Sequence, residues 1–480
     1  MSSVKSDSLK GLKWTGIEKL SVHGVQFFLG IIMARLLSPE DFGTVGMIAV
    51  FISFSQTFVD SGFSNALIRK INRTEKDFCT VFYFNIVIAL FCYCLLFFAA
   101  PYIAVFFHIP ILCKILRIQA VVLVLNSFMG VQVAKLIIDI NFKALAQRNV
   151  LAVILSGVIG VVLAYRGWGL WAIVAQSIAN SVINLTFILF YCRWVPRYGF
   201  CTESFKDLWN FGSKLLASGI LQTLYSNLTP LIIGRYFSSR DLGVYSRGTH
   251  LAKYPADIIN DMIGKVSFPV LSKIQNDDAH LIRVYRKYIA MSSIIVFFAC
   301  TLMCALAKPL VIALLTEKWM ECIIYLQVFC FSIMFDHVCR INLNLLQVKG
   351  RSDLFLKLEI VKKSIALLIL FASIPFGVIG ICISKVIYSQ IAVFINTYYT
   401  GKLFNLGYWT QVKDFFPFLL LSILCCIPAF FIAISGLNNI MCLILGSLSS
   451  LFIYLFLLRN NPYATEVKSM AKDIFSRRKK

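Results

Sequence analysis

The sequence predicts an all-α integral membrane protein with about fourteen transmembrane helices. Of its 480 residues, 59% are hydrophobic and only 14% are charged, a composition too apolar for a soluble globular domain. Long apolar runs recur along the whole chain, whereas the short alternating segments of an outer-membrane barrel are missing from it. Helices that cross the membrane are therefore the favoured structure.

Each predicted span is a run of about 20 mostly apolar residues. The range 242–265 is the least apolar of them. We include it because Leu242 and Gly243 repeat Phe42 and Gly43, which open a clearly apolar span. The spans cover residues 15–37, 43–63, 78–100, 114–138, 149–165, 168–190, 210–233, 242–265, 287–306, 320–345, 358–375, 377–399, 415–434 and 439–458.

The basic residues indicate the topology of these spans. The 46 Lys and Arg residues gather in alternate loops, at the N-terminus and in the C-terminal tail. The loops between them contain few, among them Arg35, Lys114 and Arg166. The positive-inside rule then places both termini in the cytoplasm. Because topology accounts for the net charge of +23, we expect no nucleic-acid partner.

One motif occurs twice and predicts an internal duplication. ARLLSPEDFG begins at Ala34 and GRYFSSRDLG begins at Gly234, a shift of 200 residues, and both contain Arg, Ser, Asp and Gly at equivalent places. We therefore expect an N-terminal lobe over residues 1–200, a C-terminal lobe over 201–402, and a helical hairpin with a basic cytoplasmic tail over 403–480. Two six-helix lobes of this kind would enclose a central cavity.

The sequence contains no motif for catalysis or metal binding. Its 15 Cys residues are scattered mostly within spans, and neither an HExxH motif nor paired CxxC motifs occur. The longest polar connection, residues 269–287, is too short for a soluble domain. We therefore expect no metal, no cofactor and no enzymatic activity.

Ionisable residues inside spans are the candidate functional residues, because burying a charge in the bilayer costs about 2.5–3.5 kcal/mol on insertion scales. Range 242–265 contains most of them, at steps of three or four residues that predict one helical face. We interpret this face as the polar wall of a translocation cavity, and the alternative is a helix at the cytoplasmic interface. The face carries Arg247, His250, Tyr254, Asp257, Asp261 and Lys265, with Lys253 beside it.

Other spans contain single charges or pairs. Lys385 is a lone cation in range 377–399 and the clearest candidate for a substrate contact. Asp336 and Arg340 form an i,i+4 pair that either lines the cavity or neutralises itself. Lys19, Lys135 and Asp60 lie near cytoplasmic span ends, where snorkelling to the interface is the alternative explanation.

Cations outnumber acids among these candidates, so the predicted cavity suits an anion, and phosphate is the usual partner of Lys and Arg. An H⁺ or Na⁺ ion could couple to transport through Asp60, Asp257, Asp261 or Asp336. In the repeated motif, Arg35 with Asp41 and Arg235 with Asp241 either brace a turn or form an outer gate.

Several segments carry a resemblance to a known family. These are ARLLSPEDFG, DSGFSNALIRK and TEKDFCTVFYFN in the first half, and GVYSRGTHLAKYPADII and KVSFPVLS in the second. The chain resembles the polysaccharide transporter family of the multidrug, oligosaccharidyl-lipid and polysaccharide exporter superfamily, in particular its Wzx-type, colanic-acid-exporter-like branch. The resemblance implies a flippase that transfers an undecaprenyl-pyrophosphate-linked oligosaccharide across the bacterial cytoplasmic membrane by alternating access. The product would be O-antigen, capsule or exopolysaccharide.

Three alternatives stay open. A peptidoglycan precursor flippase also carries a lipid pyrophosphate, and a drug exporter of the same superfamily would share the fold. A membrane-embedded polymerase or ligase would need a large external loop, which the sequence lacks. Further expected partners are anionic membrane lipids at the basic tail 459–480 and a polysaccharide polymerase.

Overall fold

The computed structural model describes residues 2–60 and 62–465, and the side chains of these except residues 2–13, 17, 255–266, 268, 269 and 352. This part of the chain is mostly helix and contains no β-strand. By its internal contacts the chain divides into two compact units, Met1–Gly243 and Val244–Lys480. Each unit is described by itself.

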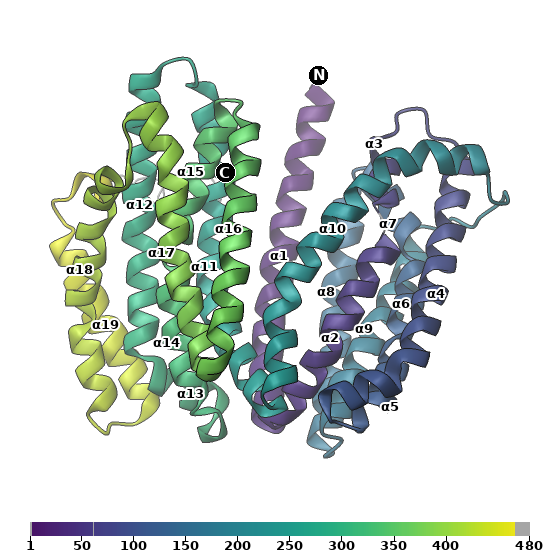
Figure 1. Cartoon of the computed structure of the whole chain (residues 1–480), viewed down its shortest axis with the longest axis horizontal. Coiled ribbons are helices and arrows are strands. Elements are labelled where there is room, and N and C mark those ends of the chain that lie inside the picture. The colour runs from purple at the N-terminus through teal and green to yellow at the C-terminus, as the bar shows by residue number, and fades with distance from the viewer. Residues whose placement is uncertain (1, 61, 466–480) are drawn as a thin grey trace. The chain divides into compact units, whose positions relative to one another are not determined.

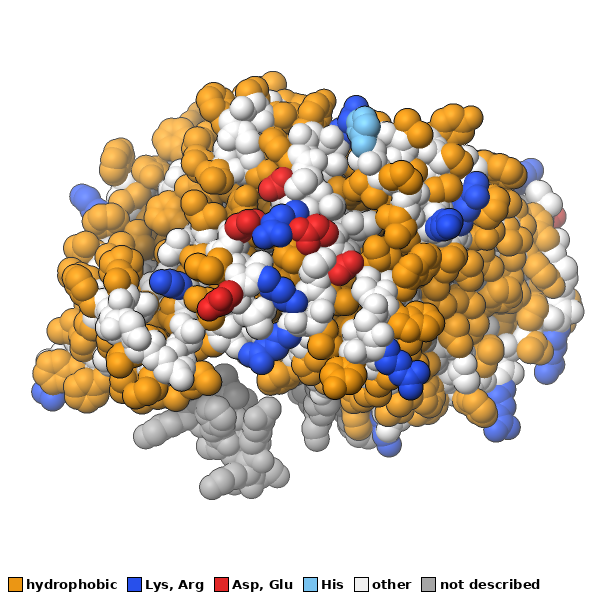
Figure 2. All heavy atoms as spheres, turned by 90° about the horizontal axis from the view of Figure 1, so that it is seen from below, with side chains coloured by type: hydrophobic (Ala, Val, Ile, Leu, Met, Phe, Trp, Pro, Cys, Tyr) orange, Lys and Arg blue, Asp and Glu red, His pale blue; other side chains and the backbone are white. Residues whose placement is uncertain are grey.

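The helices are those of a multi-pass membrane protein, which confirms the predicted fold class. Within the described residues, 11 helical segments are long and apolar enough to cross a membrane. All the predicted spans lie on helices. Two of them, 358–375 and 377–399, share the single segment Asp353–Phe404, while 210–233 and 242–265 lie on helices too polar to be among the 11. Large apolar side chains such as Phe98 and Phe452 are exposed, as lipid contact requires. Figure 2 views the molecule from below, toward the helix ends, and charged side chains gather there among many hydrophobic ones.

The helices of the first unit (Figure 1) fall into two groups that α9 connects, since it packs on α2, α5 and α6 as well as on α8. In one group α8 packs along both α1 and α9. In the other, α10 packs against α2, α3 and α4, which explains why this helix belongs to the first unit. The helices are α1 (Ser2–Leu36), α2 (Pro39–Asp60), α3 (Phe63–Arg69), α4 (Glu75–Phe107), α5 (Ile111–Gln119), α6 (Val121–Ser127), α7 (Gly130–Ile138), α8 (Phe142–Tyr165), α9 (Leu170–Tyr191), α10 (Thr202–Tyr236) and the start of α11 (Ser239–Lys273).

The repeated motif forms the same turn twice in this unit. The Asp41 carboxylate accepts hydrogen bonds from the backbone N–H and hydroxyl of Ser38, at 3.0 and 2.9 Å. Asp241 accepts the equivalent bonds from Ser238, at 3.0 and 2.6 Å. In each copy the Asp N–H also bonds back to the Ser hydroxyl. These reciprocal bonds satisfy two of the free N–H groups at the start of α2 and two at the start of α11.

The two copies of the motif also touch each other. A Cβ atom placed on Gly43 would lie 1.6 Å from the carbonyl oxygen of Ser239, and one on Gly243 would lie 1.9 Å from that of Pro39. Only glycine allows so close a backbone approach. Beside this crossing, Arg240 Nη1 lies 2.9 Å from Glu40 Oε1. The partners occupy equivalent positions in the repeat, since 40 and 240 differ by the same 200 residues.

The second unit is built around α12, which packs against α14 and α18, while α18 also packs against α19. The hairpin of α16 and α17 completes it (Figure 1). A buried polar network joins three helices: Asn342 donates to Gln411 at 2.8 Å and accepts from Thr400 at 2.8 Å. The helices are α12 (Asp278–Ala305), α13 (Ala307–Leu315), α14 (Cys322–Ile333), α15 (Asp336–Val348), α16 (Ser352–Ser373), α17 (Gly377–Phe404), α18 (Tyr408–Ile434) and α19 (Asn439–Leu457).

Candidate substrate-binding residues

A polar pocket of about 260 Å³ opens in the first unit between α1, α8 and α9. Its lining is unusual for membrane-spanning segments, because it consists mostly of amide and charged side chains. We call it the amide pocket, and its lining residues are Glu18, Lys19, Val22, His23, Gln26, Asn149, Val153, Asn180 and Asn184.

Hydrogen bonds fix part of the amide pocket and leave part of it open. Asn149 donates to the Glu18 carboxylate, and its own carbonyl oxygen accepts from Arg148 at 2.7 Å. Asn184 donates to the backbone oxygen of Asn180 at 3.0 Å. Buried Arg148 Nη1 and Asn184 Oδ1 have no hydrogen-bond partner among the described residues. Of these two residues only Asn184 lines the pocket. A buried polar atom without a partner is costly, so a polar ligand beside Asn184 would be favoured.

One edge of the amide pocket is formed by exposed polar side chains of α1, namely Lys19, His23 and Gln26. They follow one another at steps of four and three residues, so they share one face of α1. All three are exposed, although they lie in the candidate membrane span Trp14–Leu36. Such a face needs water or a polar ligand rather than acyl chains.

In the second unit, α11 divides into an apolar and a basic side. Tyr245 packs its ring against Tyr325 and Phe329 of α14, at centroid distances of 6.4 and 5.3 Å. A Cβ on Gly248 would lie 2.8 Å from that of Tyr325, so the two helices are in close contact. The basic side carries His250 and Lys253, which are exposed, and Arg247, which is half-buried.

Lys385 of α17 joins this basic side. Its side chain is half-buried, and its charge interacts repulsively with that of Lys253. Lys253 and Arg247 in turn both act on the ring of His250. The structure thus brings together four of the residues that the sequence indicated separately. We call Arg247, His250, Lys253 and Lys385 the cation group.

The remaining predicted residues of the second unit lie elsewhere or outside the described part. Asp336 and Arg340 are both exposed on α15. On the same helix, Asn344 donates to Ser267 of α11 at 2.9 Å, so α15 lies beside α11. The side chains of Asp257 and Asp261 are outside the described residues.

In the first unit, Lys135 already has several partners. Its Nζ lies 3.0 Å from Glu75 Oε1 and above the rings of Phe78 and Trp194, at 4.7 and 5.2 Å from the ring centroids. Trp194 donates to the same carboxylate at 2.7 Å. These contacts hold α7 against the start of α4, and Lys135 lines neither the amide pocket nor the cation group.

The last predicted site residues of the first unit are Asp60 and the two arginines of the repeated motif. Asp60 accepts from Gln56 at 2.9 Å, and Gln56 accepts from Asn126 at 3.0 Å. The Arg235 guanidinium lies 4.7 Å from the Phe106 ring centroid and 3.4 Å from His108 Nδ1. Arg35 is exposed at the end of α1.

The structure also adds residues that sequence reasoning missed. The pocket amides Asn149, Asn180 and Asn184 carry no charge, so a search for ionisable residues passed over them. The signal that could have found two of them is the i,i+4 spacing of Asn180 and Asn184 within an apolar span. Lys362 was also missed: its side chain is 7% exposed and pairs with Glu359.

Helical spans with polar residues among them are the architecture of a membrane transport protein. The family described as "Polysaccharide biosynthesis protein" matches residues 32–324, more than half of the chain. The protein therefore belongs to this family, which confirms the resemblance seen in the sequence.

Two curated relatives agree with this assignment. The chain is 25% identical over 310 residues to the succinoglycan biosynthesis transport protein ExoT of Rhizobium meliloti (strain 1021), covering 65% of this chain and 63% of the relative. It is 24% identical over 382 residues to the lipopolysaccharide biosynthesis protein WzxC of Escherichia coli (strain K12), covering 79% of this chain and 76% of that one.

Among solved structures, the fold is similar to the lipid II flippase MurJ in an inward closed conformation. The TM-score is 0.75 and the identity 14%, with 93% of this chain and 98% of that chain covered. At this identity the likeness establishes the fold.

Proposed function

We propose that the protein is a flippase that carries an undecaprenyl-pyrophosphate-linked oligosaccharide across the bacterial cytoplasmic membrane by alternating access. Membership of the polysaccharide biosynthesis family supports this proposal. The names of two similar proteins also support it, because ExoT is a succinoglycan biosynthesis transport protein and MurJ is a lipid II flippase. The protein would act as a transporter without a catalytic residue.

The observation that carries the proposal is that each unit contains a polar site, the amide pocket in the first unit and the cation group in the second. The cation group suits a pyrophosphate, because ammonium and guanidinium groups form strong charge-assisted hydrogen bonds with phosphate oxygens. We assign Arg247, Lys253 and Lys385 to that role, with Arg340 as a further candidate. The amide pocket suits sugar hydroxyls, which both donate and accept hydrogen bonds as amides do. Lys19 and His23 would contact the glycan at the edge of this pocket.

The proposed orientation and coupling follow from the sequence. Both termini would be cytoplasmic, and residues 1–200 and 201–402 would form the two moving lobes. Asp60, Asp257, Asp261 and Asp336 are the candidates for a coupled H⁺ or Na⁺ ion. Asp41 and Asp241 would brace the turns that they cap, and an outer gate formed with Arg35 and Arg235 is the alternative role of the motif.

Deletion of the gene is the decisive experiment. We expect surface polysaccharide to disappear while the lipid-linked oligosaccharide accumulates and stays inaccessible to glycan-modifying reagents outside spheroplasts. A plasmid copy of the gene should reverse both effects. If instead the oligosaccharide reaches the outer leaflet but stays unpolymerised, the protein is a polymerase or ligase.

A peptidoglycan precursor flippase is the second candidate, favoured by the MurJ-like fold. The same deletion separates the two proposals. Accumulation of the peptidoglycan lipid precursor, with cell lysis and normal surface polysaccharide, would favour this second function and contradict the first.

A further inference from the structure

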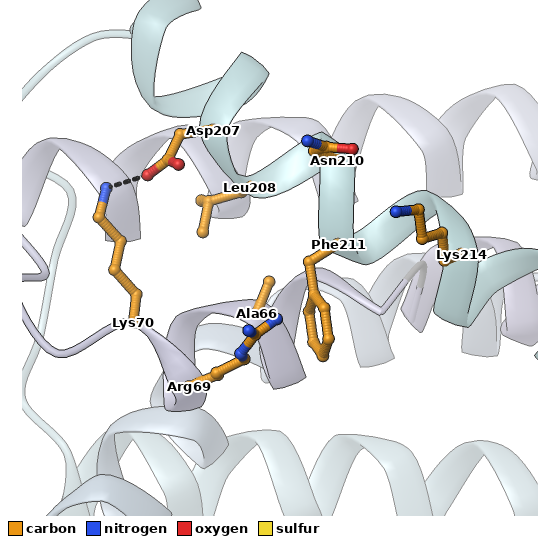
Figure 3. Close-up of a pocket in the computed structure, with 8 residues that line it drawn as sticks. All are labelled: Ala66, Arg69, Lys70, Asp207, Leu208, Asn210, Phe211 and Lys214. Atoms are coloured by element: carbon orange, nitrogen blue, oxygen red, sulfur yellow. Dashed lines mark ion pairs between the residues drawn. The ribbon is translucent and has the colours of Figure 1, made fainter.

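A second pocket in the first unit has a different character from the amide pocket. It has a volume of about 350 Å³ and lies where the end of α3 meets the first half of α10 (Figure 3). Ala66, Leu208 and Phe211 supply apolar surface to it, and the polar lining residues are Arg69, Lys70, Asp207, Asn210 and Lys214.

Lys70 is the one cation of this pocket that is already neutralised. Its Nζ lies 3.0 Å from an Asp77 oxygen and 2.8 Å from an Asp207 oxygen. Burial lowers the pKa of Lys70, but the hydrogen bonds and charges of Asp207 and Asp77 outweigh burial and raise that pKa above its usual value. Lys70 therefore holds α3 to α4 and α10 and is not available to a ligand.

Arg69 and Lys214 are available. The Arg69 guanidinium carbon lies 4.3 Å from the centroid of the Phe211 ring, so the ring fixes the cation from one side (Figure 3). Within the part of the chain that the structure describes, neither Arg69 nor Lys214 has a carboxylate partner. The pocket thus keeps two positive charges that no described acid compensates.

These groups match the needs of a phosphate. A guanidinium stacked on a ring still presents its N–H edge, which suits two phosphate oxygens at once. The Asn210 amide and the Lys214 ammonium add further donors on the α10 side of the pocket. Arg69 is also the last residue of the candidate span Pro39–Arg69, which puts the pocket at the depth of lipid headgroups.

We propose that Arg69, Asn210 and Lys214 bind the phosphate group of a membrane lipid. This site shares no residue with the amide pocket or the cation group, and it would bind lipid phosphate whatever cargo the protein moves. Two lipids could supply the group: an anionic phospholipid of the bilayer, or a polyprenyl pyrophosphate of the class proposed as substrate.

Lipid-dependent stabilisation of the purified full-length protein tests the proposal. The probes are phosphatidylglycerol, undecaprenyl pyrophosphate, inorganic phosphate and the phosphate-free digalactosyl diacylglycerol, each titrated into detergent-solubilised protein. We expect the phosphate lipids to raise the melting temperature and the phosphate-free lipid to have no such effect. A larger shift with undecaprenyl pyrophosphate would identify the substrate class, and a larger shift with phosphatidylglycerol would identify the bilayer. A response to inorganic phosphate equal to that of the lipids would overturn the assignment to a membrane lipid.

Variants connect the effect to the pocket. Loss of one charge-assisted hydrogen bond weakens binding by about tenfold or more, so Arg69→Gln with Lys214→Gln should weaken apparent lipid affinity at least that much. Lys206→Gln is the matched control, because Lys206 is exposed on the same helix but does not line the pocket. If the paired variant is unstable, Arg69→Lys is measured in its place. This variant keeps the charge and should give an intermediate affinity for the lipid. Unchanged affinity in the folded Arg69 and Lys214 variants would overturn the proposal.

Discussion

Lys385 is a cation in an apolar helix, and Lys253, the member of the cation group whose charge acts on it, is also positive. Replacing Lys385 tests whether that group binds an anion. We expect Lys385→Ala to reduce transport tenfold or more, since one charge-assisted hydrogen bond contributes about 1.5–3 kcal/mol. Lys385→Arg should retain most of the activity. The measurement is surface polysaccharide, normalised to protein abundance in the membrane.

Lys402→Ala is the control for this prediction, because Lys402 is an exposed cation near the end of the same helix. Its surface polysaccharide should match that of the unmodified protein. If Lys385→Ala lowers protein abundance instead of transport per molecule, Lys385 is structural.

Gln411 tests the buried network of the second unit. Its side chain is fully buried and bonds to Asn342, to Thr400 and to the backbone oxygen of Leu406. Gln411→Leu leaves these groups unsatisfied, at a cost of about 1–3 kcal/mol for each buried polar group. The melting temperature in detergent should therefore fall clearly. Gln390→Leu is the control and should change the melting temperature little. Among the described residues, the Gln390 side chain has a hydrogen bond only to Ser389. An equal fall in melting temperature in both variants would contradict the prediction.

At the residue scale, charge was the signal that the sequence could supply. Lys385 and Arg247 stand out because a cation in an apolar run demands an explanation. Asn149 and Asn184 do not stand out, because an amide in a span costs less and often serves packing between helices. That the charge of Lys253 acts on Lys385 depends on how the helices of the second unit are arranged, which sequence spacing along a single helix does not contain.

At the element scale, the crossing of α2 and α11 gives the sharpest prediction. Gly43→Ala would place a methyl group 1.6 Å from the Ser239 carbonyl oxygen, so the helices must separate. Overpacking of this kind costs about 1–3 kcal/mol or more. We expect both the melting temperature and the surface polysaccharide to decrease.

Gly46→Ala, one turn further along α2, is the matched control. Its new methyl group would lie 3.6 Å from Leu242 Cδ2, an ordinary contact. It should behave like the unmodified protein. Normal stability and transport in Gly43→Ala would show that the close crossing is not a feature of the protein in the membrane.

Apolar runs predicted where the helices lie better than how they are built. Range 114–138 forms three short helices, α5 to α7, and range 320–345 forms α14 and α15. Hydropathy reports only that a segment lies in apolar surroundings. A break in the helix changes the hydropathy little when short-range hydrogen bonds still satisfy the backbone groups at the break. The repeated motif was more informative, because Ser followed three residues later by Asp is a helix-start signal in itself.

For the whole molecule, the proposed cargo predicts a dependence on membrane potential. With a membrane potential of about 100 mV, negative inside, outward transfer of a substrate with two negative charges is favoured by about 4.6 kcal/mol of free energy. In vesicles containing the purified protein, outward transfer should be faster with a negative interior than without a potential. A lipid-linked sugar without phosphate charge should show no such difference. Equal rates for the pyrophosphate substrate at both potentials would argue against net movement of charge.

The class of the whole molecule could be predicted from composition, charge distribution and motif resemblance, since the bilayer limits a chain this apolar to helical spans. The division into units was harder to predict. The internal contacts separate the chain after Gly243, because α10 packs on α2, α3 and α4. A repeat in the sequence marks equivalent segments. It does not show whether a helix between the two halves, such as α10, packs with the first half or with the second.

The Glu40 and Arg240 pair has a consequence for how the two copies of the motif evolved. Both side chains are more than two-fifths exposed, so the pair adds little to stability. Two unchanged copies, however, would set Glu against Glu or Arg against Arg, and both combinations repel. Divergence at this position makes the first copy prefer the second over another first copy. The contact therefore favours the pairing of a first copy with a second copy over the pairing of two identical copies.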